Sequence, residues 1–199
     1  MAPAAPSFPR LARVLLLLAV SLGALSLGAC RDRYVVRHAA TPNPLRAVRT
    51  FAAEPLLFEA RIEGKSEGDW VAKQNEERRR AWPAGKTAMM AAFSRGLATD
   101  AQAGGLAITA APGAPGTHRI RAVVRHVEPG SFDGPTSTDT MVEVDVEILS
   151  PEGMVLDAIT SRAVVPATAL NLDLEDRLRD AAKNVGENVA RYLRDRTGT

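Results

Sequence analysis

Two segments with a two-residue hydrophobic period constrain the fold of this 199-residue chain most strongly. Residues 118–128 and 140–149 each alternate apolar side chains with charged ones. The apolar positions are Ile120, Ala122 and Val124 in the first segment and Val142, Val144, Val146 and Ile148 in the second. Because successive side chains of a β-strand point to opposite faces, each segment is predicted to be a strand with one buried face and one solvent-exposed face.

The charged faces of these two segments complement each other. Antiparallel pairing places Arg121 opposite Glu147. The same register places Arg125 opposite Glu143 and centres the connection between the strands at Gly134. Cross-strand ion pairs of this kind contribute about 0.2–1 kcal/mol each, so they specify the register more than they add to stability.

The rest of the chain predicts further strands and three helices. Extended segments are expected at residues 45–53, 56–62, 106–110 and 154–165, and helices at residues 69–82, 83–99 and 173–194. Pro83 suits the first turn of a helix, so it is expected to end one helix and begin the next. Asp173 is the expected N-cap of the last helix. Together these elements predict an α+β fold, a four- or five-stranded, mainly antiparallel sheet with helices packed on one face.

Composition narrows the classes of protein to which the chain can belong. Apolar residues make up 46% of it, and Gly, Pro and Cys number 15, 13 and 1, which excludes collagen-like, wholly disordered and disulfide-framework proteins. Basic side chains number 25 and acidic ones 23, so the charge gives no indication of nucleic-acid binding. The length fits one domain, which we expect at residues 45–199.

The N-terminal segment is typical of an export signal. The first 13 residues carry two arginines and no acid, and residues 14–29 are uncharged. The uncharged run ends in Leu27-Gly28-Ala29-Cys30, and Cys30 is the single cysteine of the chain. The alternatives are a transmembrane anchor and an ordinary secretory signal with a chance cysteine. The uncharged run is of marginal length for a membrane span and contains glycine and serine, which argues against a transmembrane anchor. An unpaired cysteine is unusual in a secreted protein, which argues against an ordinary secretory signal.

This tetrapeptide resembles a bacterial lipobox. The resemblance implies that Leu27, Gly28 and Ala29 are recognised by the signal peptidase and that Cys30 receives the lipid. It also implies a cleaved signal peptide over residues 1–29, a short lipidated tether over residues 30–44, and anchoring in the membrane through acyl chains. In Gram-negative lipoproteins an Asp after the cysteine commonly retains the protein in the inner membrane. Arg31 therefore favours the outer membrane, with the domain facing the periplasm.

No set of catalytic residues stands out, so we expect a non-enzymatic protein without a cofactor. An enzyme, such as a hydrolase, with a site dispersed through the chain is a further alternative. The Gly-Lys-Thr sequence at residues 85–87 matches the end of a phosphate-binding loop, but the glycine needed five positions earlier is Arg80. His118 and His126 would lie roughly 26 Å apart along one strand and could not share a metal ion. We therefore expect neither a nucleotide nor a metal site.

A block of mixed charge at residues 73–80 is the best candidate for an interaction surface. Its three consecutive arginines adjoin two glutamates, an arrangement that is usually a solvated helix face. The two tryptophans that flank the block either present aromatic rings to a partner or fix this segment to the domain. The candidate partner surface comprises Trp70, Arg78, Arg79, Arg80, Trp82 and, in the long connection 129–139, Phe132.

A lipobox followed by strand, helix, antiparallel strands and a closing helix resembles small periplasmic accessory lipoproteins. Examples are the penicillin-binding-protein activators, the curli-secretion lipoproteins and the N-terminal domain of the Tol-system periplasmic protein. The resemblance covers roughly residues 45–195 and implies a non-enzymatic interaction or assembly accessory of an envelope protein partner, with no nucleic acid. The alternative is a binder of a lipid, glycan or other small ligand in a groove between sheet and helices.

Overall fold

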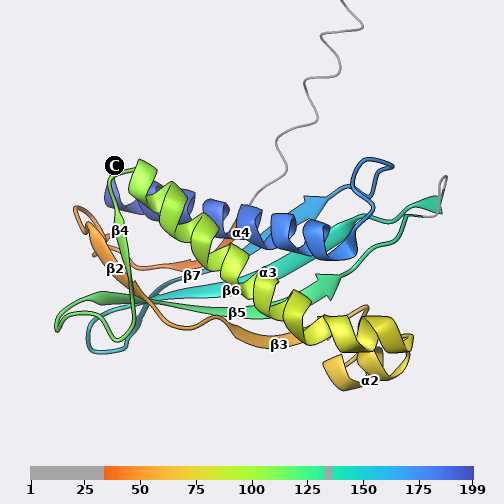
Figure 1. Cartoon of the computed structure of the whole chain (residues 1–199). Coiled ribbons are helices and arrows are strands. Elements are labelled where there is room, and N and C mark those ends of the chain that lie inside the picture. The colour runs from red at the N-terminus through yellow and green to blue at the C-terminus, as the bar shows by residue number, and fades with distance from the viewer. Residues whose placement is uncertain (1–33, 133–135) are drawn as a thin grey trace, which may run out of the picture. The chain divides into compact units, whose positions relative to one another are not determined.

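The computed structural model describes residues 34–132 and 136–199. The predicted signal peptide, the lipobox with Cys30, and Gly134 lie outside the described residues. The described part is an α+β domain, as predicted, in which two long helices cover one face of a sheet (Figure 1). No helix in this part of the chain is long and apolar enough to cross a membrane.

The sheet has seven strands and mixes parallel with antiparallel pairs. The strands are β1 (Tyr34–Ala39), β2 (Thr50–Ala53), β3 (Leu57–Ile62), β4 (Ala107–Ala110), β5 (His118–Glu128), β6 (Thr140–Leu149) and β7 (Val155–Val165). Their order is β1-β7-β6-β5-β2-β4, and β3 pairs with the half of β5 that β2 leaves free. The β1, β7, β6 and β5 pairs are antiparallel, whereas β2 and β3 pair in parallel with β5, and β4 in parallel with β2.

The prediction of a four- or five-stranded, mainly antiparallel sheet is therefore wrong. Parallel partners need a long crossover. The helices α2 (Glu67–Ala72) and α3 (Glu76–Ala103) lie in the crossovers from β2 to β4 and from β3 to β5. Pairing across so many residues leaves no local pattern in the sequence. The tether predicted at residues 30–44 also contains β1, which pairs with β7 and belongs to the sheet.

The central hairpin confirms half of the predicted register. Arg121 lies opposite Glu147, as expected. A β-bulge then shifts the register by one residue, so that His126 rather than Arg125 faces Glu143. The guanidinium of Arg125 bonds instead to the carboxylates of Glu59 and Asp145.

Pro83 does not separate two helices, contrary to the prediction, because it lies inside α3. The break comes earlier, where the side chain of Asn75 accepts a hydrogen bond of 2.8 Å from the backbone N–H of Arg78 and caps the helix. A proline inside a helix removes one backbone hydrogen bond. Here Trp82 and Gly85 on either side are buried, so packing holds the helix together across that position.

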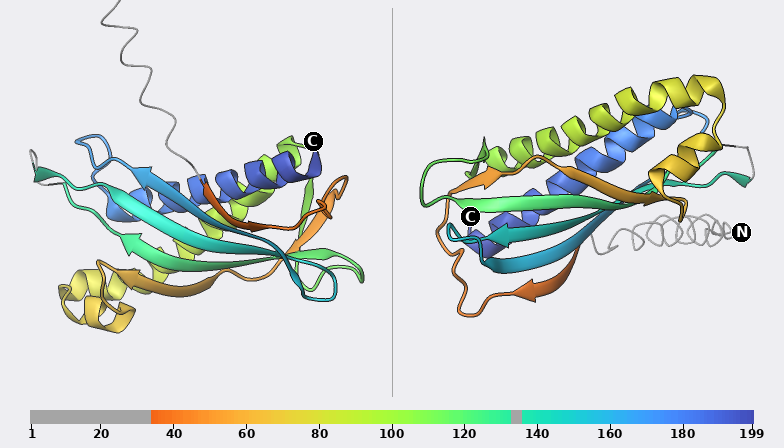
Figure 2. Two further views of the ribbon diagram at one scale, coloured as in Figure 1. Left: turned by 180° about the vertical axis from the view of Figure 1, so that it is seen from behind. Right: turned by 90° about the horizontal axis from the view of Figure 1, so that it is seen from below.

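The helices α3 and α4 (Leu174–Thr197) run parallel and touch closely (Figure 2). The start of α4 meets α3 where Glu175 faces Gly85, and the ends of the two helices meet where Arg194 bonds to Asp100 at 2.6 Å. In between, a methyl group at Gly186 would collide with the backbone carbonyl of Phe93. Both helices pack onto the inner face of the sheet and form with it one continuous apolar core, which includes Phe51, Ile120, Val146, Phe93, Leu178 and Val185.

Candidate functional site

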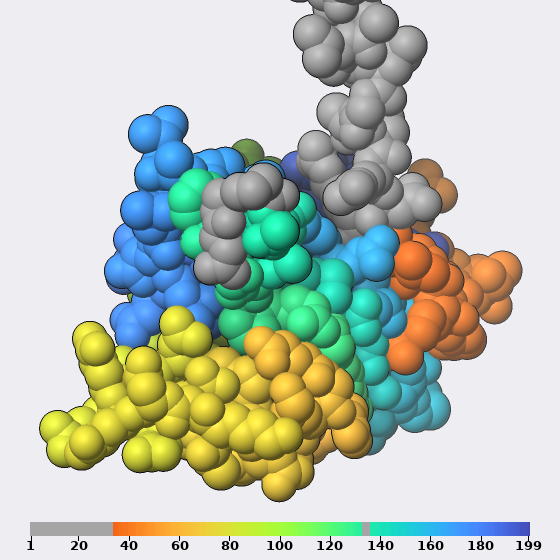
Figure 3. Space-filling view, turned by 90° about the vertical axis from the view of Figure 1, so that its right-hand side faces the viewer, coloured from red at the N-terminus to blue at the C-terminus, as the bar shows by residue number. Residues whose placement is uncertain are grey.

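Because α3 and α4 are parallel, both begin at the same end of the domain. We call this the helix-start end. It comprises α2, the first turns of α3 and α4, the described part of the β5–β6 connection, and residues 166–173 before α4 (Figure 3). The positive ends of two helix dipoles lie here, partly offset by acidic residues in the first turns, Glu76, Glu77, Glu175 and Asp176.

Trp70 and Trp82 do not form a partner surface, because the structure buries both. Their exposed fractions are 1% and 6%, and their rings pack against each other with centroids 4.9 Å apart. The indole N–H of Trp82 donates a 2.7 Å hydrogen bond to the Glu67 carboxylate. The two tryptophans thus fix α2 to α3, the second of the two roles considered for them.

Lys86 is also engaged within this packing. Its ammonium bonds to Glu67 at 2.6 Å and lies 5.0 Å from the centre of the Phe58 ring. Residues 85–87 are in the middle of α3, not in a loop preceding a helix. Their backbone N–H groups therefore cannot form the cradle that a phosphate-binding loop provides.

The three arginines at the start of α3 are exposed but differ in their contacts. Arg80 pairs with Glu76 within the helix. Arg79 donates to the backbone carbonyl of Gln74 at 3.1 Å, and Arg78 donates to the side-chain oxygen of Gln74 at 3.3 Å. Of the three, Arg78 is the one that lines the cavities at the helix-start end.

Apolar side chains that no sequence pattern marks are also exposed at the helix-start end. Leu170 and Leu172, in the segment before α4, have exposed fractions of 99% and 58%. Phe132, which was selected, is 36% exposed. Leucines in a loop carry no distinctive pattern, so only their exposure in the fold identifies them.

Two cavities open at the helix-start end. One of about 270 Å³ lies between the starts of α3 and α4, with Trp82, Gly85 and Leu178 in its wall. The other, of about 500 Å³, is lined by Arg78, Gly130, Ser131, Phe132, Leu172, Leu174 and Arg177. The ligand groove considered above would lie between sheet and helices, whereas these two cavities lie at the end of the helix pair.

Arg177 is the residue of this region that sequence reasoning missed most completely. It is only 2% exposed, although its position in an amphipathic helix suggests an ordinary surface arginine. Burial lowers the pKa of its guanidinium, Asp173 opposes that shift, and the positive charge of Arg78 adds to it. Arg78 and Arg177 line the same cavity, where their like charges repel each other.

The histidines contribute no cluster of metal ligands. His118 and His126 lie far apart on β5, and His126 contacts Glu128 at 2.7 Å. Burial lowers the pKa of His118. Within residues 34–132 and 136–199, no three His, Cys, Asp or Glu side chains come together as metal ligands would.

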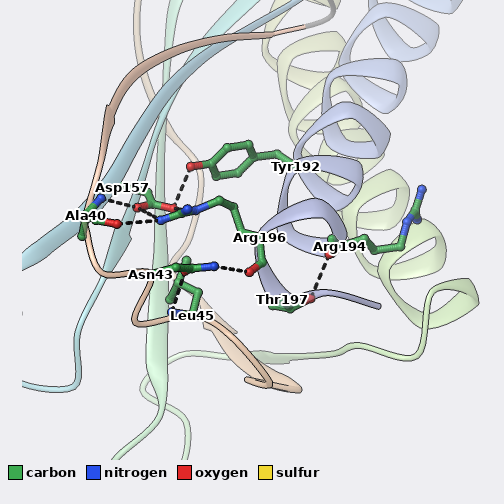
Figure 4. Close-up of polar contacts among 8 residues, drawn as sticks. All are labelled: Ala40, Asn43, Leu45, Asp157, Tyr192, Arg194, Arg196 and Thr197. Carbon is green, nitrogen blue, oxygen red and sulfur yellow. Dashed lines mark hydrogen bonds and ion pairs between the residues drawn. The ribbon is translucent and has the colours of Figure 1, made fainter.

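A second polar cluster surrounds Asp157 at the opposite end of α4 (Figure 4). Its buried carboxylate accepts hydrogen bonds of 2.7 Å from Arg196 Nε, 2.7 Å from the Tyr192 hydroxyl and 3.0 Å from the Ala40 N–H. Burial alone would raise the pKa of Asp157, but these donors hold it below its usual range. The cluster ties the segment after β1 to β7 and to the last turn of α4, a structural role.

The hydroxyl groups of the two tyrosines beside this cluster both donate hydrogen bonds to carboxylates. Tyr34 donates to Asp195 at 2.9 Å, and its ring packs edge-on against Tyr192 with centroids 5.3 Å apart. Burial, followed by the carboxylate of Asp195, raises the pKa of Tyr34 to about 12. Burial and Asp157 likewise raise the pKa of Tyr192. Neither phenol is therefore poised to act as an acid or base near neutral pH.

No protein-family description matches the chain, and no curated protein matches its sequence. Among solved structures, the PelC dodecamer from Paraburkholderia phytofirmans aligns with 14% identity and a TM-score of 0.43, covering 78% of this chain and 96% of that one. A PelC variant from the same organism aligns with 16% identity and a TM-score of 0.41, covering 78% and 96%. A neuraminyllactose-binding hemagglutinin homolog from Helicobacter pylori aligns with 10% identity and a TM-score of 0.34, covering 80% and 86%. Similarities this weak carry no argument about function.

Proposed function

We propose that this chain is a lipid-anchored accessory protein of the Gram-negative envelope, held in the outer membrane and facing the periplasm, which binds an envelope protein partner without catalysing a reaction. The observation that carries the proposal is the single cysteine, Cys30, at the end of a signal-like segment in the order Leu27-Gly28-Ala29-Cys30. Three residues separate this cysteine from the first described strand, which begins at Tyr34. The anchor and the domain are thus directly connected.

The helix-start end is the surface that we propose for the partner. Leu170 and Leu172 expose apolar area in the segment before α4, and Leu172 lines the same cavity as the exposed Arg78. Exposed apolar side chains next to arginine are typical of protein interfaces, where they become buried on association. This surface keeps Arg78, Arg79, Arg80 and Phe132 from the sequence-based candidates and replaces the buried tryptophans with the two leucines.

The experiment is crosslinking in living cells of the anchored protein, followed by mass spectrometry of the captured species. We expect a discrete partner that the chain with Leu170→Ser and Leu172→Ser captures at least fivefold less. Met154→Ser is the matched control, because Met154 is 63% exposed but lies in the β6–β7 turn at the other end of the sheet. Cys30→Ser tests whether capture needs the anchor.

Each outcome bears on the proposal. Equal capture by the double variant and the Met154→Ser control would overturn the assignment of the surface. Capture of nothing beyond background, or equal background from the anchored and Cys30→Ser forms, would overturn the role as an anchored accessory. Circular dichroism of the purified variants shows whether the substitutions leave the fold intact.

A small ligand is the second candidate, and the cavity of about 500 Å³ favours it, because cavities of roughly 300–1,000 Å³ are of the size that holds small molecules. Its place at the helix-start end differs from the groove between sheet and helices that the sequence suggested.

A further inference from the structure

The cavity of about 500 Å³ combines two positive side chains with an apolar wall. Arg78 enters it from α3 and Arg177 from α4, while Phe132, Leu172 and Leu174 supply the apolar surface. None of the described residues that line it is acidic. A wall of this kind suits a molecule with a negative group at one end and an apolar portion at the other.

Arg177 is held rigidly at this cavity by neutral oxygen atoms. Its Nε donates to the Thr140 hydroxyl at 2.9 Å, and its Nη1 donates to the backbone carbonyls of Asn171 at 2.9 Å and Leu172 at 2.7 Å. The Thr140 hydroxyl in turn donates to the carbonyl of Pro129 at 2.6 Å. The guanidinium is therefore fixed in position before any ligand arrives, which lowers the entropic cost of binding.

Neutral oxygen atoms hold Arg177, and the nearby carboxylate of Asp173 acts on its charge without forming an ion pair with it. Arg177 is only 2% exposed, yet no carboxylate among the described residues forms an ion pair with it. Asp173 is near, but its carboxylate caps α4 by accepting a 2.7 Å hydrogen bond from the Glu175 N–H. A buried charge that lacks a partner is costly, and an anion in the cavity would reduce that cost.

Arg78, which lines the cavity from α3, also has no ion-pair partner in the described part of the chain. It is exposed, its side chain has one weak hydrogen bond of 3.3 Å to Gln74, and its charge repels that of Arg177. An anion between the two guanidinium groups would replace this repulsion with two attractions. The start of α4, whose first residue Leu174 also lines the cavity, adds a dipole that the acidic residues of its first turn partly offset.

We infer that this cavity binds a small amphiphilic anion, with its carboxylate or phosphate between Arg78 and Arg177 and its apolar chain against Phe132 and Leu172. The inference develops the second candidate above and depends neither on the lipid anchor nor on a protein partner. A failed crosslinking experiment would leave it intact, because binding is measured on the purified protein alone.

The test is isothermal titration calorimetry on the purified protein as the cell produces it, in phosphatidylcholine nanodiscs if it carries acyl chains and in buffer if it does not, with the same medium without protein as the blank. Hexanoate and hexyl phosphate are the probes, and hexanamide is the uncharged analogue of matched length. We expect an anionic probe to bind at least tenfold more tightly than hexanamide. The preference between hexanoate and hexyl phosphate distinguishes a carboxylate source from a phosphate source.

Variants locate the binding. Arg78→Ala should weaken binding of the preferred probe at least fivefold, because it removes one charged contact from an exposed side chain without disturbing the core. Phe132→Ser should weaken hexanoate more than acetate, since only hexanoate has an apolar chain to cover. Arg95→Ala is the matched control, an exposed arginine of α3 at a distance of 17 residues, or roughly 26 Å along the helix. It should leave affinity unchanged.

Three results would overturn the inference. One is hexanamide binding as tightly as the anions, and another is Arg78→Ala binding as tightly as the unsubstituted protein. The third concerns Asp133, which follows Phe132 in the sequence and lies outside the described residues. If the unsubstituted protein binds no anionic probe and the Asp133→Asn chain binds one, a carboxylate of the chain itself occupies the cavity and no external ligand is needed.

Discussion

Asp157 shows how a buried charge is stabilised in this domain. Its carboxylate is fully buried and accepts hydrogen bonds from Arg196, Tyr192 and the Ala40 N–H. Removing one member of a buried ion pair leaves the other charge without a partner, at a cost of about 3 kcal/mol. We therefore expect Asp157→Asn to lower the free energy of unfolding by about 3 kcal/mol in urea denaturation. Asp180→Asn, at an exposed position on α4, should change it by less than 0.5 kcal/mol in magnitude, roughly the limit for surface substitutions.

The same pair of proteins tests the pH dependence. The pKa of Asp157 is lower in the folded protein than in the unfolded chain. The stability it contributes is therefore fully present above its ordinary pKa of about 3.9 and is lost as the pH falls through the folded pKa. The difference in unfolding free energy between the unsubstituted protein and Asp157→Asn should be constant from pH 5 to 8 and shrink below pH 4. A difference that stayed constant down to pH 2 would contradict the assigned role of the ionised carboxylate.

At the scale of elements, the parallel packing of α3 and α4 depends on small residues at their contact. A methyl group at Gly186 would collide with the Phe93 carbonyl, so Gly186→Ala should cost about 1–3 kcal/mol although alanine favours helices more than glycine does. Gly68 in α2 offers the opposite case, because a methyl group there would meet no atom within 4 Å. Gly68→Ala should therefore stabilise the domain by up to about 1 kcal/mol. Thermal unfolding of both variants checks this reversal of sign, and stabilisation by Gly186→Ala would refute close packing.

Elements with a regular hydrophobic period were predicted well, and those defined by distant contacts were not. β5 and β6 have the predicted bounds, and Asp173 is the N-cap of α4, as expected. Two-residue and helical periods are local signals that survive in the fold. The bulge that moves Arg125 away from Glu143, and the passage of α3 through Pro83, depend on neighbouring strands and helices. No local pattern contains that information.

At the scale of the whole molecule, the residues of the candidate site also divide into those that the sequence marks and those that only the fold identifies. The arginines 78–80 and Phe132 could be selected because charge runs and aromatic loop residues are visible in a sequence. Trp70 and Trp82 were open to two interpretations, and only their burial decides between them. Arg177 is hidden in the sequence because it lies on an otherwise ordinary charged helix. Its burial arises only when α4 is placed against the β5–β6 connection.

The proposed anchor makes a prediction for the whole protein that does not involve the folded domain. Cys30→Ser should release the mature chain from the membrane fraction, because the acyl chains on this cysteine are its proposed anchor. Arg31→Asp should keep the lipid but move the protein from the outer to the inner membrane, by the sorting preference of Gram-negative lipoproteins. Sucrose-gradient fractionation and labelling with a palmitate analogue measure both effects, and Arg31→Lys is the control for the substitution itself. The anchor proposal fails if the Cys30→Ser chain stays with the membrane and the unsubstituted chain takes up no label. An Arg31→Asp chain that is labelled but stays in the outer membrane would contradict only the proposed sorting by residue 31.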